Sequence, residues 1–190
     1  MKTPSFTSLK NQFLIAMPKM VDSSFASTLT VICEHSPQGA LGIIVNRPTN
    51  LTVEEIFHQV GIERVSRGAK MNNTVYSGGP VAVDRGFVLN SSERQWESFL
   101  RINDEVQLTT SRDILLALAA QEGPADFLLA LGYAGWGAGQ LEQELADNAW
   151  LNCEFDPAII FNTPAHLRLN KAASSLGVDL SLISDQVGHA

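Results

Sequence analysis

Short apolar runs separated by turn-forming residues recur along this 190-residue chain, and they predict a sheet with many strands. Two of these runs, residues 29–34 and 40–46, flank the turn-forming cluster Ser36-Pro37-Gln38-Gly39 and predict an antiparallel hairpin. Both runs are almost continuously apolar, which is typical of strands in the covered part of a sheet. Further strands are predicted at residues 13–16, 74–76, 86–89, 127–131 and 158–161.

Segments with helical periodicity and capping residues lie between these runs. Thr52 and Glu55 have the spacing of a capping box at the start of a helix over residues 53–60. Thr110 and Asp113 have the same spacing before a second helix that ends at Gly123. Further helices are predicted at residues 138–147 and, with Thr163 as the cap and Pro164 as the first residue, up to about residue 177, with a last turn at 180–183.

The segment from residue 131 to residue 145 combines four glycines with two aromatic residues and then an acidic run. Closely spaced glycines indicate a backbone that needs freedom from Cβ at several points. We therefore expect a strand-to-helix corner of defined shape, a place where ligands or partners often dock. Because no charged side chain precedes Glu142, Tyr133 and Trp136 are interpreted as packing anchors or as the apolar wall of a site.

These elements predict an α+β fold, with residues 1–190 forming a single domain around a mixed, mainly antiparallel sheet flanked by helices. Residues 1–11 are expected to be a flexible N-terminus, and residues 63–73, with Arg67 and Lys70, a mobile surface connection. No run of 18 apolar residues and no signal-peptide pattern is present. We therefore expect a cytoplasmic protein that does not bind membranes.

Charge is distributed unevenly along the chain. Residues 1–112 contain eleven Lys and Arg against ten Asp and Glu, whereas residues 113–190 contain two against ten. Neutralising the phosphates of a duplex requires many cations, so binding of nucleic acid is disfavoured. A local anion site needs only two or three donors and stays open. Cys33 and Cys153 lack metal-ligand spacing and are expected to be reduced core thiols, with no metal site.

Nine short segments carry the most distinctive residue patterns. They are Phe13-Leu14-Ile15-Ala16-Met17-Pro18, Cys33-Glu34-His35, Gly39-Ala40-Leu41-Gly42, Asn46-Arg47-Pro48, Ser77-Gly78-Gly79-Pro80-Val81, Asp84-Arg85-Gly86-Phe87-Val88, Leu108-Thr109-Thr110-Ser111-Arg112-Asp113, Gly132-Tyr133-Ala134-Gly135-Trp136 and Gly188-His189-Ala190. In this order they resemble the bacterial AlgH/YqgE family. The resemblance implies a partly closed, barrel-like sheet and a role in the regulation of alginate production, but no settled biochemical activity. Asn90 stands where many relatives have a histidine, which weakens any scheme with a catalytic imidazole there.

Three arginines, Arg47, Arg85 and Arg112, lie next to predicted strand ends or helix starts, where side chains and free N–H groups can meet a ligand. A cation in the first helical turn, such as Arg112, opposes the helix dipole unless an anion compensates. The compensating group is either a bound anion or a carboxylate of Asp84, Asp113 or Glu34, and the salt bridge is favoured. The candidate ligand-binding set is Arg47, Ser77, Gly78, Gly79, Asp84, Arg85, Thr110, Ser111 and Arg112.

Several weaker patterns have a structural explanation that is favoured. Residues 77–79 could form an N–H nest for phosphate, but a tight turn is preferred. Cys33 and His35 would face the same side of a strand as nucleophile and base, but a buried thiol and a hairpin-end imidazole are the favoured explanation. Glu142 and Glu144 are interpreted as a solvated acidic face, and the sequence assigns no role to His189.

The leading functional hypothesis is a cytoplasmic regulatory or adaptor module, which needs no cofactor and binds a protein partner or a small anionic ligand. The alternative is a hydrolase or transferase of a phosphorylated small molecule, with Asp84 or Asp113 as base. Direct DNA binding in transcriptional regulation is the third hypothesis. The acidic C-terminal half and the lack of a basic recognition helix argue against it.

Overall fold

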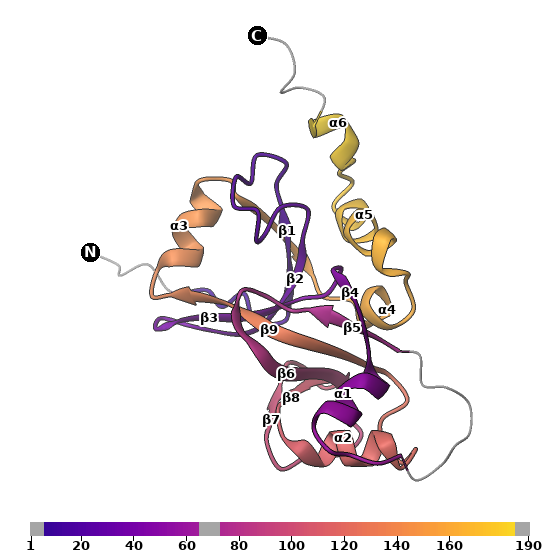
Figure 1. Ribbon diagram of the computed structural model, residues 1–190. Helices are drawn as coiled ribbons and strands as arrows, with labels where there is room; N and C mark the ends of the chain where they lie inside the picture. Colours follow the sequence, from indigo (N-terminus) through magenta and orange to yellow (C-terminus); the bar gives the residue numbers. More distant parts are fainter. Residues whose placement is uncertain (1–5, 65–72, 185–190) are drawn as a thin grey trace.

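The computed structural model describes residues 6–64 and 73–184, and over these residues ten strands form one sheet that curls into a half-barrel (Figure 1). The main strand order is β10-β1-β2-β3-β9-β6-β8-β7, with β4 paired to β5 and β5 to β9. The β5–β9 pair is parallel, and the other pairs are antiparallel. The predicted α+β fold with a mixed, mainly antiparallel, barrel-like sheet is therefore confirmed.

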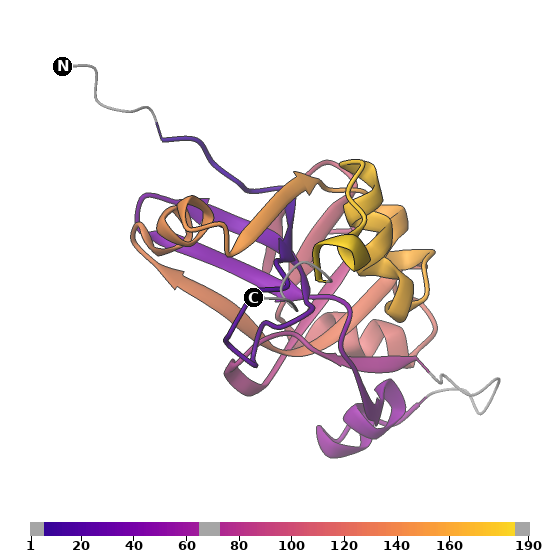
Figure 2. The same cartoon turned by 90° about the horizontal axis from the view of Figure 1, so that it is seen from above.

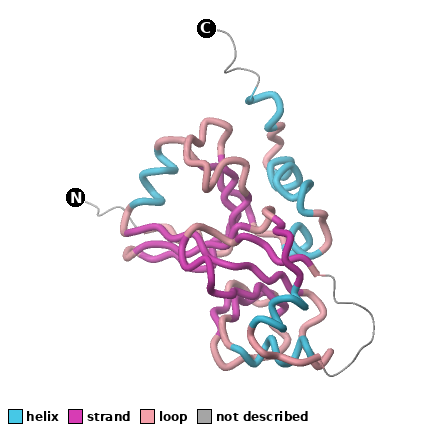
Figure 3. The backbone as a smooth tube through the Cα atoms, viewed as in Figure 1, coloured by secondary structure: helices cyan, strands magenta, loops and turns pink. Residues whose placement is uncertain are grey.

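The strands are β1 (Gln12–Ala16), β2 (Leu29–Ser36), β3 (Gly39–Ile44), β4 (Pro48–Thr52), β5 (Thr74–Ser77), β6 (Val81–Ser91), β7 (Phe99–Arg101), β8 (Val106–Thr109), β9 (Phe127–Gly137) and β10 (Trp150–Glu154). The helices are α1 (Val53–Gln59), α2 (Arg112–Ala119), α3 (Gln140–Ala146), α4 (Pro157–Phe161), α5 (Ala165–Ser175) and α6 (Leu180–Ser184). Figure 3 shows these helices around the outside of the strands. Within the described ranges, none of the helices is both long enough and apolar enough to cross a membrane.

Two local predictions are confirmed by the geometry. Strands β2 and β3 form the expected antiparallel hairpin. The capping box before α1 is complete: the Glu55 carboxylate accepts from the Thr52 backbone N–H at 2.7 Å, and the Thr52 hydroxyl accepts from the Glu55 N–H at 3.3 Å. The backbone donor at Thr52 lowers the pKa of Glu55. Local hydrogen bonding alone thus specifies where α1 begins.

Three predicted elements need correction. Residues 158–161 belong to α4 and not to a strand, because Asp156 caps the Ala158 N–H at 2.9 Å and Pro157 occupies the first turn. Helix α5 begins after Pro164, so Thr163 is not its cap. The strand-to-helix corner predicted within residues 131–145 lies later than expected, since β9 continues to Gly137 in pairing with β3 and α3 begins at Gln140.

The apolar side chains form three cores on the two faces of the curled sheet. One face packs against α4 and α5 through residues such as Phe13, Phe87 and Ile160. The opposite face carries a second core beneath α1 and α2, and a third beneath α3 and the loop over residues 17–28. Figure 2 shows α5 and α6, at the yellow end of the colour scale, grouped on one side of the sheet. Each helix thus covers a defined part of the sheet.

Strand β9 and the segment that follows β5 approach each other too closely for side chains. Gly132 has φ +78°, and a Cβ there would lie 2.4 Å from the carbonyl oxygen of Gly79. Gly79 has φ +152°, and its Cβ would lie 2.1 Å from the carbonyl carbon of Tyr133. The Gly78 N–H donates to Leu131 O at 2.8 Å across the same contact. These glycines therefore serve backbone packing.

Candidate functional site

A cleft of about 350 Å³ lies between α1, α2 and the outer face of β6 and β9. Its wall and floor are largely apolar, and its polar groups come from the bend of β6 and from the junction of β8 with α2. The lining residues are Ile56, Gln59, Val60, Asp84, Arg85, Gly86, Val88, Thr109, Thr110, Ser111, Arg112, Leu115, Leu129 and Leu131. The structure thus brings together five of the nine predicted ligand-binding residues: Asp84, Arg85, Thr110, Ser111 and Arg112.

The start of α2 supplies the polar end of this cleft. Ser111 is the N-cap residue, so the capping box predicted for Thr110 and Asp113 is wrong. The Asp113 carboxylate accepts instead from the Ser111 hydroxyl at 2.6 Å, the Glu97 N–H at 2.8 Å and the Ile114 N–H at 3.0 Å. Desolvation would raise the pKa of Asp113, but these donors together lower it below its ordinary value. Asp113 is therefore a structural anion that fixes the start of α2.

Arg112 is the first residue of α2 and is exposed at the rim of the cleft. The predicted salt bridge to Asp84, Asp113 or Glu34 is wrong, since Arg112 forms no ion pair with any described residue. Its backbone N–H, at the positive end of the helix, also has no acceptor among the described residues. Both the guanidinium and the helix start are consequently available to an anion.

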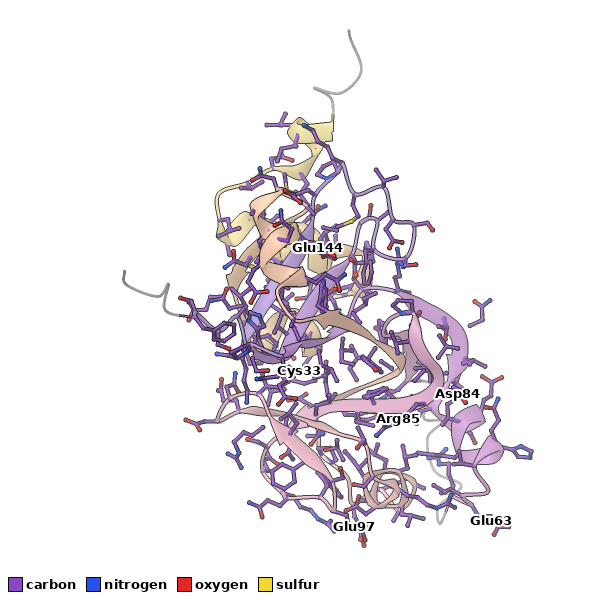
Figure 4. The ribbon with its side chains drawn as sticks, turned by 90° about the vertical axis from the view of Figure 1, so that its left-hand side faces the viewer. Cys33, Glu63, Asp84, Arg85, Glu97 and Glu144 are labelled. Atoms are coloured by element: carbon purple, nitrogen blue, oxygen red, sulfur yellow. The ribbon has the colours of Figure 1, made fainter. Side chains whose placement is uncertain are left out.

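Asp84 and Arg85 are adjacent residues of β6 and lie on the side of the cleft near α1. Both are labelled in Figure 4. The Arg85 guanidinium lies 5.4 Å from the centroid of the Phe87 ring. Phe87 belongs to the core on the face opposite to Val88, which lines the cleft. The charge of Arg85 is thus directed away from the cleft, while the Asp84 side chain is exposed and accepts no hydrogen bond from a described residue.

The other predicted ligand-binding residues do not line this cleft. The Arg47 guanidinium donates to three carbonyl oxygens of the loop over residues 17–28, those of Ser23 at 3.1 Å, Ser24 at 2.5 Å and Ala26 at 2.8 Å. Arg47 therefore holds that loop against the sheet. At Ser77 the N–H donates to Arg47 O at 2.9 Å, and at Gly78 it is bonded to β9 as described above. The N–H nest considered for Ser77, Gly78 and Gly79 is consequently not formed.

Cys33 and His35 do not face the same side of β2, because a β-bulge between Ile32 and Glu34 reverses the alternation. Cys33 lies in the core beneath α4 and α5, and burial strongly raises the pKa of its thiol. His35 accepts the Leu9 N–H at its Nδ1 atom at 2.9 Å, and its Nε2 atom lies 3.0 Å from the Glu142 carboxylate. The imidazole thus holds the segment before β1, and the two residues form no catalytic pair.

The acidic residues of α3 have partners that the sequence pattern did not reveal. The carboxylate of Glu144, labelled in Figure 4, accepts the indole N–H groups of Trp136 and Trp150, both at 2.8 Å. Phe25 packs against both indole rings. Trp136 is 6% exposed and Tyr133 packs against the first core, and both residues also line a cleft beside Leu41. The side-chain amide of Gln140, one helical turn earlier, donates to the Glu144 carboxylate at 2.9 Å.

A buried polar network supports the floor of the cleft. The Asn90 Oδ1 atom accepts from Trp96 Nε1 at 3.2 Å and from Gln107 Nε2 at 3.1 Å. The Asn90 Nδ2 atom donates to the Thr109 hydroxyl at 3.0 Å, and Thr109 lines the cleft. An amide at position 90 therefore joins β6 to β8 directly behind the lining of the cleft.

Some predicted features lie outside the described residues or do not occur among them. Arg67, Lys70 and His189 lie outside residues 6–64 and 73–184. The same holds for part of the predicted flexible N-terminus, whereas Ser8 and Leu9 hydrogen-bond to His35. In the part of the chain that the structure describes, no group of three or more His, Cys, Asp and Glu residues is arranged to hold a metal ion.

Comparison with known proteins gives a consistent set of relatives. A family model described as AlgH-like matches residues 13–181. A UPF0301 protein of Pseudomonas putida strain F1 is 53% identical over 190 residues, covering 100% of both chains, and one from Thioalkalivibrio sulfidiphilus is 54% identical over 180 residues, covering 95% of this chain and 96% of the relative.

Two solved structures share the fold. The solution structure of the AlgH protein from Pseudomonas aeruginosa covers 100% of both chains with a TM-score of 0.80 and 49% sequence identity. The crystal structure of protein DIP2367 from Corynebacterium diphtheriae has a TM-score of 0.71 at 19% identity, covering 96% of this chain and 94% of that one. At that identity the second likeness concerns the fold alone.

Proposed function

Since this chain belongs to the AlgH-like family, we propose that it is a cytoplasmic regulatory module, and that the cleft between α1 and α2 binds a small anionic ligand. A role in the regulation of alginate production, which the resemblance to the family implies, is part of this proposal. We also propose that residues 1–190 form a single domain. Regulation through a ligand or protein partner suits a chain with an acidic C-terminal half better than direct contact with DNA.

The observation that carries the proposal is the position of Arg112. A guanidinium without a carboxylate partner stands at the first residue of α2, beside a helix N–H that also has no partner among the described residues. The helix dipole disfavours a cation at this end, and a bound anion would offset that cost. Thr110 and Ser111 add hydroxyl groups, and Leu115, Leu129 and the other apolar residues can bury the rest of the ligand.

Thermal-shift measurements test this proposal with inorganic phosphate, AMP, ATP and acetyl phosphate as probes. A ligand present at 100 times its Kd stabilises by about 2.7 kcal/mol, which for a chain of this size raises Tm by roughly 5–10 °C. Arg112→Gln should abolish the shift. Arg101→Gln, a change of an exposed arginine on β7 that does not line the cleft, should leave it intact. If no probe raises Tm in either the wild type or the variants, the ligand proposal is refuted.

An enzyme that acts on a phosphorylated small molecule is the second candidate, because Asp84 lines the same cleft as Arg112 and its carboxylate accepts no hydrogen bond from described residues. Asp84 is then the base of choice, since the Asp113 carboxylate is occupied by three donors. Turnover of a stabilising probe that disappears in Asp84→Asn would favour this candidate. Binding without turnover in both proteins would favour the regulatory module.

A further inference from the structure

Arg168, in the first half of α5, is a buried cation without a carboxylate partner. Its side chain is packed between α5, β5 and the connection from β3 to β4, and the residue is 6% exposed. The Nε–H donates to Thr163 O at 2.9 Å, and one terminal nitrogen donates to Val45 O at 2.5 Å. No described Asp or Glu forms an ion pair with it. A buried charge without a counterion is costly, so an acceptor of opposite charge would be strongly favoured here.

The guanidinium has hydrogen-bonding capacity left after these two carbonyl contacts, because it carries five N–H donors. The Tyr76 ring centroid lies 4.9 Å from its central carbon. Burial lowers the pKa of Arg168, and the Tyr76 hydroxyl beside it acts in the opposite direction. The surroundings of Arg168 thus contain dipoles that partly compensate the charge, but no neutralising anion among the described residues.

Arg168 lines a second cleft, of about 250 Å³, that lies where strands β5 and β9 separate. The parallel ladder of these strands consists of Tyr76–Ala130 and Ser77–Leu131, and the cleft lies beyond its end. Figure 1 shows α4 next to β5 on this side of the sheet. The polar lining comes from Asn73, Thr74, Tyr76 and Arg168, and the apolar lining from Phe127, Leu128, Leu129, Ile160 and Phe161.

The chemistry of this lining favours a carboxylate over a phosphate. Arg168 is the one cation that lines the cleft in the described part of the chain, and no acidic side chain lines it. A planar guanidinium matches a singly charged carboxylate, whereas a phosphate dianion would keep about half of its charge uncompensated. The aromatic and aliphatic walls suit a short apolar body.

We propose that the cleft formed by Arg168, Tyr76, Thr74 and Phe161 is a second ligand site, which binds a small monocarboxylate with its carboxylate on the Arg168 guanidinium. This site shares only Leu129 with the lining of the cleft at Arg112, and the proposal does not rest on the function proposed above. The carboxylate neutralises the buried charge, and the apolar body of the ligand lies between Phe127 and Phe161.

The test is a titration of the ¹⁵N-labelled full chain, followed by two-dimensional NMR, with butyrate, butyramide and inorganic phosphate as probes. Butyrate should give saturable shifts of the Thr74, Phe127 and Phe161 amides, with a Kd on the order of 1 mM for a ligand of this size. Butyramide has the same shape without the charge and should bind at least tenfold more weakly. Phosphate that binds as well as butyrate would overturn the assignment of the ligand class.

Two variants locate the bound carboxylate. Arg168→Gln should abolish the saturable shifts. If this variant does not fold, Tyr76→Phe tests whether the carboxylate binds in this cleft. Tyr76→Phe keeps the ring over the guanidinium and removes one hydroxyl, so it should weaken butyrate binding roughly fivefold. Arg112→Gln should leave the titration unchanged. Shifts that do not saturate, equal binding of butyramide, or unchanged binding in Tyr76→Phe would each overturn the proposal.

Discussion

The close approach of β9 to the segment after β5 yields a prediction with an internal control. Gly132 and Gly139 have nearly the same positive φ, +78° and +73°. A Cβ at position 132 would lie 2.4 Å from Gly79 O and 3.1 Å from Val81 O, whereas a Cβ at position 139 would meet nothing within 4 Å. Replacing each glycine by alanine therefore separates the cost of the left-handed backbone from the cost of crowding.

The two costs can be put on one scale. A left-handed alanine costs about 1–2 kcal/mol, and the reduced freedom of the unfolded chain returns about 0.4–1 kcal/mol of that. Gly139→Ala should thus lower the free energy of unfolding by about 1 kcal/mol. Crowding in a packed region adds about 1–3 kcal/mol, so Gly132→Ala should lower it by about 2–4 kcal/mol, or Tm by roughly 5–15 °C.

Urea denaturation followed by tryptophan fluorescence measures both values, with linear extrapolation to zero denaturant. The slope of each transition should match that of the wild type, because both variants retain the same buried surface. If Gly132→Ala and Gly139→Ala differ by less than about 0.5 kcal/mol, crowding is not the reason for a glycine at position 132, and the argument from Cβ distances is wrong.

Three further predictions follow from individual side chains. Glu144→Ala leaves two buried indole N–H groups without an acceptor and should lower the free energy of unfolding by about 2–4 kcal/mol. Glu144→Gln keeps an acceptor and should lower it by about 1 kcal/mol. Equal losses of the two variants in urea denaturation would contradict this. Because the pKa of Asp113 is lowered on folding, its contribution to stability is present above about pH 4 and is lost as the pH falls through the lowered value. The difference in unfolding free energy between wild type and Asp113→Asn should therefore shrink from about pH 6 to about pH 3, and a constant difference would refute this linkage. Burial raises the pKa of both Cys33 and Cys153, so neither thiol should react with Ellman's reagent until the chain unfolds; fast modification of the native protein would disprove their burial.

Local patterns in the sequence were sufficient to predict the elements whose structure is determined by local interactions. The Thr52–Glu55 capping box and the β2–β3 hairpin depend on residues within a few positions of one another, and both were predicted correctly. Strand β9 shows the opposite case, because its last residues are held by pairing with β3, about 95 positions away in the chain. The glycines of that segment looked like a turn, but tertiary contact requires the one at position 132, whereas a Cβ at position 139 would meet nothing within 4 Å.

The sequence predicted only part of the candidate site, because some of its contacts depend on tertiary structure. Asp84, Thr110, Ser111 and Arg112 meet because β6 and β8 are neighbours in the sheet, and these residues were selected because they lie next to predicted strand ends and helix starts. The sequence did not show that Arg47 lies outside the site, since its three carbonyl acceptors belong to an irregular loop. Arg168 gave no signal at all, because a single arginine on a helix does not reveal whether a carboxylate faces it.

Leu129 is the residue through which the two clefts meet, since it lines both of them. It lies in β9, between the cleft at Arg112 and the one at Arg168, and its side chain is almost fully buried. A ligand that displaced Leu129 in one cleft would alter a wall of the other. Thermodynamic linkage then requires that each ligand change the protein's affinity for the other ligand by the same factor. Strand β9 would in this way couple the binding of two different molecules to the half-barrel.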